Sequence, residues 1–134
     1  MLFRSVLCSD AELKTQADGS WDILGDPTEG ALVVVAAKAG IDGFALRSHY
    51  PREAEIPFSS ERQLMAVWVH DRDGLLQAPL GSLAEGSRTL LISKGAPEVI
   101  LTTCSRWIDG SGVVPLEAHE RRWWLEQEIG RAHV

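Results

Sequence analysis

The sequence KGAPE, residues 94–98, marks the point where a strand is expected to give way to a helix. Residues 89–93 before it have the β-branched and aliphatic composition of a buried strand. Residues 99–101 after it supply the apolar side of a short helix. Pro97 suits the first turn of such a helix, where its missing N–H costs nothing. The chain is therefore expected to contain a strand that passes directly into a helix, with a lysine at the junction.

Lys94 at this junction has two interpretations. Its ammonium group and the partial positive charge of the helix N-terminus together suit an anion. Gly95 and Ala96 remove side-chain bulk, so that a ligand can approach the backbone. The alternative is a solvated lysine at the end of a strand, and these five residues alone favour that alternative.

A second helix start is expected at residues 26–29. Asp26 is a good N-cap, Pro27 a good first helical residue, and Glu29 stands three residues after Asp26, as in a capping box. The helix is expected to continue through residues 31–39 and to stop at Gly40. Both carboxylates could accept a hydrogen bond from an amino group of a ligand, but the spacing alone favours the capping box.

The rest of the pattern indicates antiparallel strands joined by hairpins. Residues 62–70 combine β-branched and aromatic side chains, which marks a central strand. The other expected elements are helices at 5–13 and 116–128, strands at 21–24, 52–57, 75–80 and 88–93, turns at 18–20, 71–74 and 81–86, a loop at 43–51, and a hairpin or loop at 108–114. The predicted fold class is α+β, an antiparallel β-sheet flanked by helices, in one domain over residues 1–128.

Composition excludes several kinds of site. The net charge of −6 argues against a nucleic-acid or anionic-membrane surface, although a local basic pocket remains compatible with it. Cys8 and Cys104 are far apart, and the four histidines show no ligand spacing, so neither a disulfide nor a metal site is predicted. No catalytic Ser-His-Asp or Cys-His arrangement can be argued, and the apolar run at residues 31–37 is too short to span a bilayer.

Phe58 lies between Pro57 and two serines, at the start of a strand. An aromatic ring in such a place could stack on a nucleotide base, which is worth roughly 1–3 kcal/mol. The alternative is ordinary core packing, which is the commoner role of a single phenylalanine.

Four motifs in this order resemble the nucleotide-binding (N) domain of P-type cation-transporting ATPases, closest to the calcium-pump and sodium-pump branch and its bacterial members. The motifs are LCSDA at residues 7–11, GDPTEGAL at 25–32, FSSER at 58–62 with Met65, and KGAPE at 94–98. The resemblance covers nearly the whole chain. It implies the fold of that domain, ATP as ligand (Mg-ATP in the intact pump), and the phosphorylation and actuator domains of the pump as partners. It also implies a cytoplasmic domain of an integral membrane protein, with no direct membrane contact of its own.

The resemblance implies ATP-binding roles for residues of the FSSER and KGAPE motifs. Phe58 is similar to the aromatic residue that stacks on adenine. Lys94 is similar to the lysine at the base of the pocket, near the adenine and the phosphate tail, with Gly95 leaving room for the ring. Met65 corresponds to a lining residue, and Arg62 has either a phosphate-side or a structural role.

Glu29, helped by Thr28 and Asp26, is similar to the polar wall beside the adenine amino group. Two departures from the family pattern remove positive charge. Gln63 stands where the motif commonly places a lysine, and Ser60 stands where calcium pumps of animal muscle carry an arginine. Binding of the phosphate tail is therefore expected to be weak.

The phosphorylated aspartate of the family lies in a DKTG motif, which this sequence lacks. The expected function is therefore to bind ATP and to position it for phosphoryl transfer to an aspartate of a separate domain, with no turnover by this chain alone.

We expect the chain to be an incomplete N domain that stops before the arginine-bearing strand of the family. Residues 129–134 match one reading frame of a common sequencing adapter, which raises the hypothesis of a non-native tail. The alternative function is a non-catalytic protein-interaction domain that docks through its acidic surface and the helix around Trp123, with a vestigial nucleotide pocket.

Overall fold

A three-stranded antiparallel sheet lies at the centre of the molecule, with β4 between β3 and β5. The computed structural model describes residues 2–77, 86 and 88–132, and of residues 128–132 the backbone alone. Its elements are α1 (Leu2–Leu7), β1 (Glu12–Thr15), β2 (Trp21–Leu24), α2 (Pro27–Lys38), α3 (Gly43–His49), β3 (Arg52–Ser59), β4 (Leu64–His70), β5 (Thr89–Gly95), α4 (Pro97–Thr103), β6 (Arg106–Asp109), β7 (Gly112–Pro115) and α5 (Ala118–Ala132). The predicted central strand at residues 62–70 is confirmed over Leu64–His70, while residues 62 and 63 belong to the turn that precedes it.

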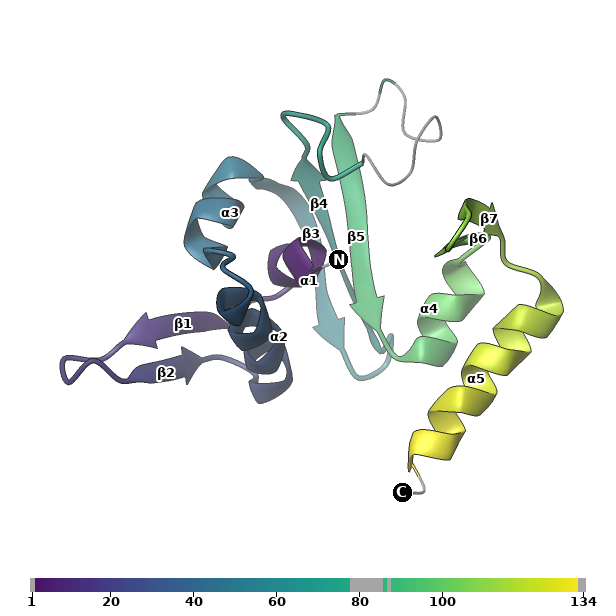
Figure 1. Ribbon diagram of the computed structural model, residues 1–134, viewed down its shortest axis with the longest axis horizontal. Coiled ribbons are helices and arrows are strands. Elements are labelled where there is room, and N and C mark those ends of the chain that lie inside the picture. Colours follow the sequence, from purple (N-terminus) through teal and green to yellow (C-terminus); the bar gives the residue numbers. More distant parts are fainter. Residues whose placement is uncertain (1, 78–85, 87, 133–134) are drawn as a thin grey trace.

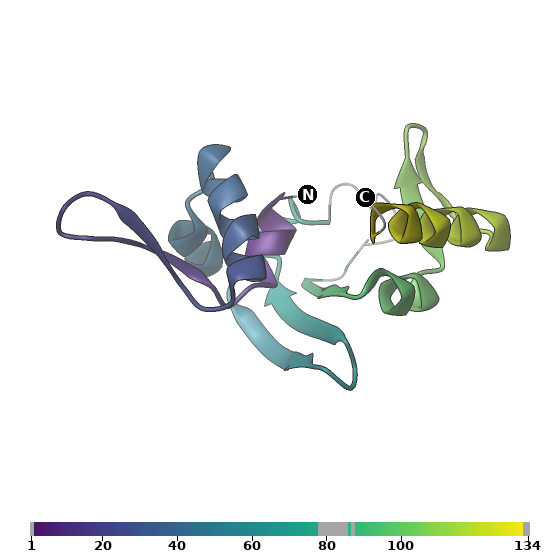
Figure 2. The ribbon, with the colours of Figure 1, turned by 90° about the horizontal axis from the view of Figure 1, so that it is seen from below.

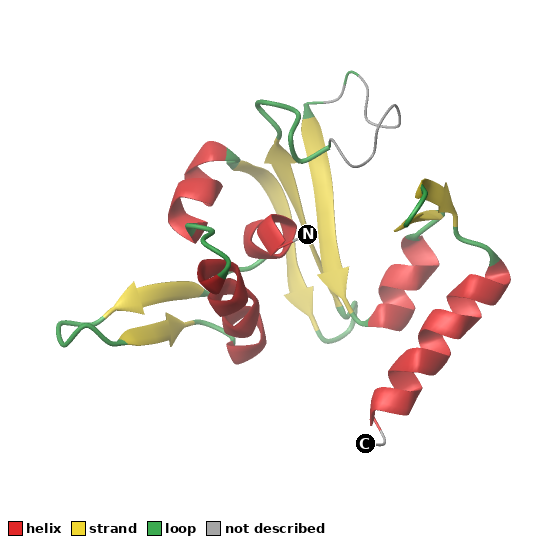
Figure 3. Ribbon diagram, viewed as in Figure 1, coloured by secondary structure: helices red, strands yellow, loops and turns green. Residues whose placement is uncertain are grey.

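The flanking elements form two groups around this sheet. The helices α1, α2 and α3 and the β1–β2 hairpin lie to one side, and α4, α5 and the β6–β7 hairpin lie to the other (Figures 1 and 2). The regular elements of the described chain are thus antiparallel strands and separate helices, joined by loops and turns (Figure 3). The predicted α+β class is confirmed.

The core lies between the end of α1 and one face of the sheet. On β4 the alternate residues Met65, Val67 and Val69 are buried against Leu7 and Cys8. Directly opposite them on β5 stand Lys94, Ile92 and Leu90, in that order. Because cross-strand partners project to the same face of a sheet, Lys94 is the charged end of an otherwise apolar row.

Two predictions at the N-terminal side are wrong. The helix expected at residues 5–13 ends at Leu7, because the chain beyond it turns away and Glu12 pairs with Leu24 in the β1–β2 ladder. The loop expected at residues 43–51 contains α3, because the Asp42 carboxylate caps it by accepting hydrogen bonds from the N–H groups of Phe44 and Ala45, both at 3.0 Å. Asp42 is an N-cap signal that the sequence analysis missed.

The predicted return strand at residues 75–80 is also wrong in its described part, residues 75–77, which form a turn. The Asp73 carboxylate accepts from the Leu75 N–H at 3.0 Å, and Asp71 accepts from Gln77 at 3.1 Å, so side chains take the place of a ladder. Residues 78–80, and most of the expected turn at 81–86, lie outside the described residues. Tyr50 donates its hydroxyl to Asp73, and burial together with this carboxylate raises the pKa of Tyr50 to about 12. Asp73 thereby pins the end of α3 to this turn.

Gly95 is required where β5 leaves the sheet. A Cβ at this position would overlap the Gln63 carbonyl oxygen and lie 2.9 Å from the Leu64 Cα. The same Gln63 carbonyl accepts a hydrogen bond from the Ala96 N–H at 2.9 Å, and Gln63 itself has a positive φ of 51°. The β3–β4 turn therefore occupies the space that a side chain at Gly95 would need.

This close approach predicts a specific loss of stability. Gly95→Ala should lower the free energy of unfolding by about 1–3 kcal/mol, because the backbone of β4 has to shift. The matched control is Gly110→Ala, since a Cβ at Gly110 meets nothing within 4 Å. Urea unfolding of both variants measures the difference. Equal losses of unfolding free energy would show that the close contact with the β4 backbone does not require glycine at position 95.

Candidate functional site

Lys94 is held between two partners. Its ammonium group forms an ion pair with Oε1 of Glu29 and donates to the Ser9 hydroxyl oxygen at 3.1 Å. The side chains of Lys94 and Glu29 are only 26% and 15% exposed. The alternative of a solvated lysine at a strand end is therefore excluded.

The second oxygen of Glu29 binds the backbone between α1 and β1. Oε2 accepts hydrogen bonds from the N–H groups of Asp10 at 2.6 Å and Ala11 at 3.1 Å. These N–H groups are extra donors for the carboxylate, and bonds of this kind to a charged acceptor are among the stronger ones. Glu29 thus joins the start of α2 to both β5 and the segment after α1.

The capping box predicted at the start of α2 is half wrong. Asp26 does cap the helix, since its Oδ1 accepts from the N–H groups of Thr28 at 2.8 Å and Glu29 at 3.2 Å. These bonds, that from Glu29 first, hold the pKa of Asp26 below its usual range. The Glu29 carboxylate, in contrast, accepts from the Lys94 ammonium group and from two N–H groups of the segment after α1.

Ser9 is a site residue that the sequence analysis left without a role. It is fully buried, and its hydroxyl donates to the Ser5 carbonyl at 2.7 Å. Its oxygen is therefore oriented to accept from Lys94. The motif LCSDA was recognised in the sequence, but nothing local to it indicates that its serine meets a lysine 85 positions further on.

Phe58 and Met65 lie next to each other across the β3–β4 pair. Ile56 pairs with Ala66 and Ser59 with Leu64, so that Pro57 and Phe58 together face Met65 alone in a β-bulge. The Phe58 ring is 58% exposed, which excludes simple core packing, whereas Met65 is 1% exposed and belongs to the core. A bulge of this kind changes the direction of a side chain, here that of the aromatic Phe58 next to the β3–β4 turn.

Arg62 supports this bulge from the β3–β4 turn. Its guanidinium donates to the Pro57 carbonyl at 2.8 Å, and its N–H donates to Ser59 Oγ at 3.2 Å. Of the two roles left open for Arg62, these contacts support the structural one. At Gly95 the missing side chain leaves room for the Gln63 backbone, which is a different reason from the space for a ligand that the sequence suggested.

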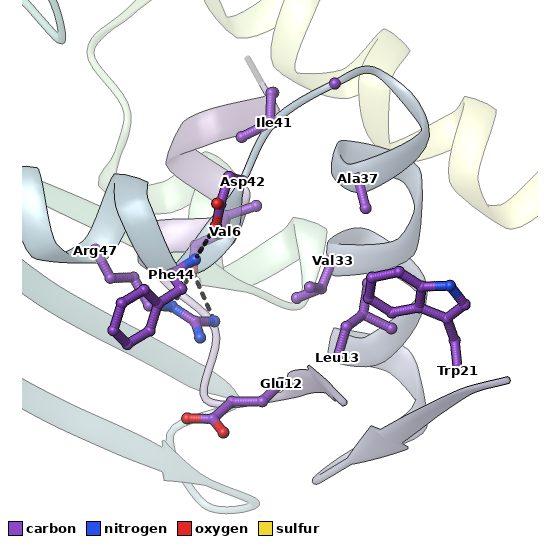
Figure 4. Close-up of a pocket in the computed structure, with 12 residues that line it drawn as sticks. Val6, Glu12, Leu13, Trp21, Val33, Ala37, Ile41, Asp42, Phe44 and Arg47 are labelled. Carbon is purple, nitrogen blue, oxygen red and sulfur yellow. Dashed lines mark hydrogen bonds between the residues drawn. The ribbon is translucent and has the colours of Figure 1, made fainter. Parts of the chain in front are cut away.

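A cavity of about 490 Å³ lies elsewhere, between α2, α3 and the β1–β2 hairpin. Trp21 and Phe44 stand on opposite sides of it, and Glu12 lies below (Figure 4). Its lining includes none of the predicted binding residues. The Arg47 guanidinium beside it is engaged by backbone carbonyls, so few polar groups remain there to orient a ligand.

Among the residues that the structure describes, no group of three or more His, Cys, Asp or Glu side chains is placed to hold a metal ion. Within the same ranges, no helix has the length and apolarity needed to cross a membrane.

Comparison with known proteins gives the family. The family model for the P-type ATPase cytoplasmic domain N matches residues 1–130. The chain is 38% identical over 120 residues to the cation-transporting ATPase pma1 of Synechocystis, which covers 89% of the chain. It is 38% identical over 111 residues, 82% of the chain, to a probable cation-transporting ATPase F of Mycobacterium tuberculosis, and 34% identical over 123 residues, 91% of the chain, to a calcium-transporting ATPase of Bacillus subtilis. The chain therefore belongs to the family of P-type ATPase cytoplasmic N domains.

The chain spans 11–12% of the length of these three relatives. The family assignment thus applies to one domain of much longer proteins. It agrees with the resemblance seen in the four sequence motifs and with the α+β class of the fold.

The Glu29 contacts predict a loss of stability on neutralisation. Glu29→Gln should cost about 1–3 kcal/mol of unfolding free energy, because a charge-assisted bond to Lys94 is lost and the amide cannot accept at both ends. Glu98→Gln is the control, since Glu98 is an exposed carboxylate in the first turn of α4. Denaturant unfolding measures the stability of both variants. If Glu29→Gln costs no more stability than Glu98→Gln, Glu29 contributes only as a negative charge near a helix N-terminus.

Proposed function

We propose that this chain binds ATP at the end of the sheet next to the β3–β4 turn, where Phe58 of β3 and Lys94 of β5 flank Met65 and where Glu29 of α2 reaches Lys94. The observation that supports this is the convergence of the sequence motifs. Ser9, Glu29 and Lys94 come from three of the four motifs, and Lys94 contacts both of the others. The fourth motif supplies the bulge that places Phe58 opposite Met65, the cross-strand partner of Lys94.

Each group in this arrangement has a chemical use toward a nucleotide. The exposed Phe58 ring offers a face on which a base can stack. Glu29 already accepts from Lys94 and from two N–H groups, and a carboxylate has about four acceptor positions, so one remains for the amino group of adenine. Thr28 and Asp26, exposed at the start of α2, complete this polar side.

In the intact protein the domain would hold ATP while the γ-phosphoryl group passes to an aspartate of a separate domain. Positioning is the larger part of catalysis in such transfers. Magnesium would come with the nucleotide as Mg-ATP. The whole protein would be an ATP-driven cation pump, with this domain on its cytoplasmic side and the phosphorylation and actuator domains as its partners.

Stacking on Phe58 is the first test. Phe58→Ala should weaken ATP binding by roughly 1–3 kcal/mol, because the platform for the base is removed. Phe44→Ala is the matched control, since Phe44 is 83% exposed on α3. Calorimetric titration of the folded variants measures both. Equal affinity in all three proteins would contradict the assignment, and a folded chain with no saturable binding would favour a non-catalytic interaction domain.

The charge of the site predicts little dependence on the phosphate tail. Glu29 neutralises Lys94, and the uncharged Ser60 and Gln63 stand at the two positions where the family pattern has basic residues. ATP, ADP and AMP should therefore bind within about tenfold of one another, roughly 1.4 kcal/mol. Salt should weaken binding only modestly. Titration of the three nucleotides at two salt concentrations measures this, and a hundredfold preference for ATP would require cations that this site does not contain.

A further inference from the structure

The segment between α1 and β1, residues 8–11, is gripped by two arginines. Arg47 Nη2 donates to the carbonyl oxygens of Ser9 at 2.8 Å and Ala11 at 2.9 Å. Arg52 Nη2 donates to the Ser9 carbonyl at 2.8 Å, and its Nη1 donates to the Asp10 carboxylate at 2.6 Å. Two guanidinium groups thus converge on a single carbonyl oxygen.

Other groups of the same segment meet the candidate nucleotide site. The Ser9 hydroxyl accepts from Lys94, and the N–H groups of Asp10 and Ala11 donate to Glu29. Carbonyl groups of the segment therefore bind the arginines, while its N–H and hydroxyl groups bind the ion pair. A rotation of these peptides would break contacts of both kinds together.

Capping of α1 does not account for this arrangement. Arg47 and Arg52 do reach the carbonyls of Val6 and Leu7 at the end of the helix, where unpaired carbonyl groups attract cations. The Ser9 and Ala11 carbonyls, however, lie beyond the helix. Two like charges that share one acceptor also repel each other, and burial lowers the pKa of Arg47. A helix cap alone would need neither feature.

We infer that Arg47 and Arg52 are positioning residues of the nucleotide site. They hold residues 8–11 so that Ser9 and the two N–H groups orient the Lys94–Glu29 pair for the ligand. The inference deepens the proposed function and rests on it for its effect on affinity. Its effect on Lys94 in the free protein does not depend on nucleotide binding.

The first experiment observes Lys94 without any nucleotide. The chain has three lysines, Lys14, Lys38 and Lys94, and the first two are exposed, so their side-chain resonances can be told apart after selective ¹³C labelling. Arg47→Gln and Arg52→Gln should each move the Lys94 Cε resonance toward the positions of the other two. The control is Arg121→Gln, which removes an arginine–carbonyl bond at Cys104 and should leave Lys94 unchanged.

The second experiment separates positioning from general stability. Arg47→Gln should weaken ATP binding by about tenfold in the unaltered chain, and by less than about twofold in a Glu29→Gln background, because neighbouring groups that act together are not additive. The thermal stability that Arg47→Gln costs should be lost equally in both backgrounds. If a glutamine variant does not fold, Arg52→Lys takes its place, because lysine keeps the charge but lacks the paired donors of arginine.

The outcomes distinguish the two proposals. An unaltered chain that binds no ATP overturns the proposed function, while the Lys94 resonance still decides whether the arginines hold the ion pair. A chain that binds ATP, with an unmoved Lys94 resonance or with the full tenfold loss retained in the Glu29→Gln background, overturns the positioning role alone.

Discussion

The ion pair between Lys94 and Glu29 connects parts of this chain that are far apart in sequence. Lys94 ends the apolar row on β5, Glu29 lies in the first turn of α2, and the segment after α1 contacts both through Ser9 and two N–H groups. Removing one partner of a shielded pair leaves a charge without compensation, which is far costlier than losing an exposed pair. The position of α1 over the sheet and the entry into α2 therefore depend on this contact.

The same contact sets the character of the proposed site. A lysine that is already paired offers little net charge to a phosphate tail, and Gln63 and Ser60 add none. An exposed ring at a bulge, by contrast, needs no charge to hold a base. The site thus suits recognition of the base more than of the phosphates. This is consistent with a domain that positions a nucleotide for chemistry carried out elsewhere.

Local signals in the sequence were sufficient for much of the fold. The Asp26 cap, Pro97 at the start of α4 and the composition of β4 all predicted the observed elements. Errors arose where side chains rather than a helix or a ladder satisfy backbone groups. Arginines from α3 and β3 bind the carbonyls at the end of α1, and Asp71 and Asp73 bind N–H groups within residues 75–77 in place of a strand.

The sequence by itself determined the family and the α+β class, because ordered motifs and hydrophobic alternation are local and survive without coordinates. Only the tertiary structure decided what the residues of the candidate site contact. Glu29 has the spacing of a capping box, yet its carboxylate binds Lys94 and the Asp10 and Ala11 N–H groups. A carboxylate has several acceptor positions, and here the folding of distant segments brings an ammonium group and two N–H groups within its reach.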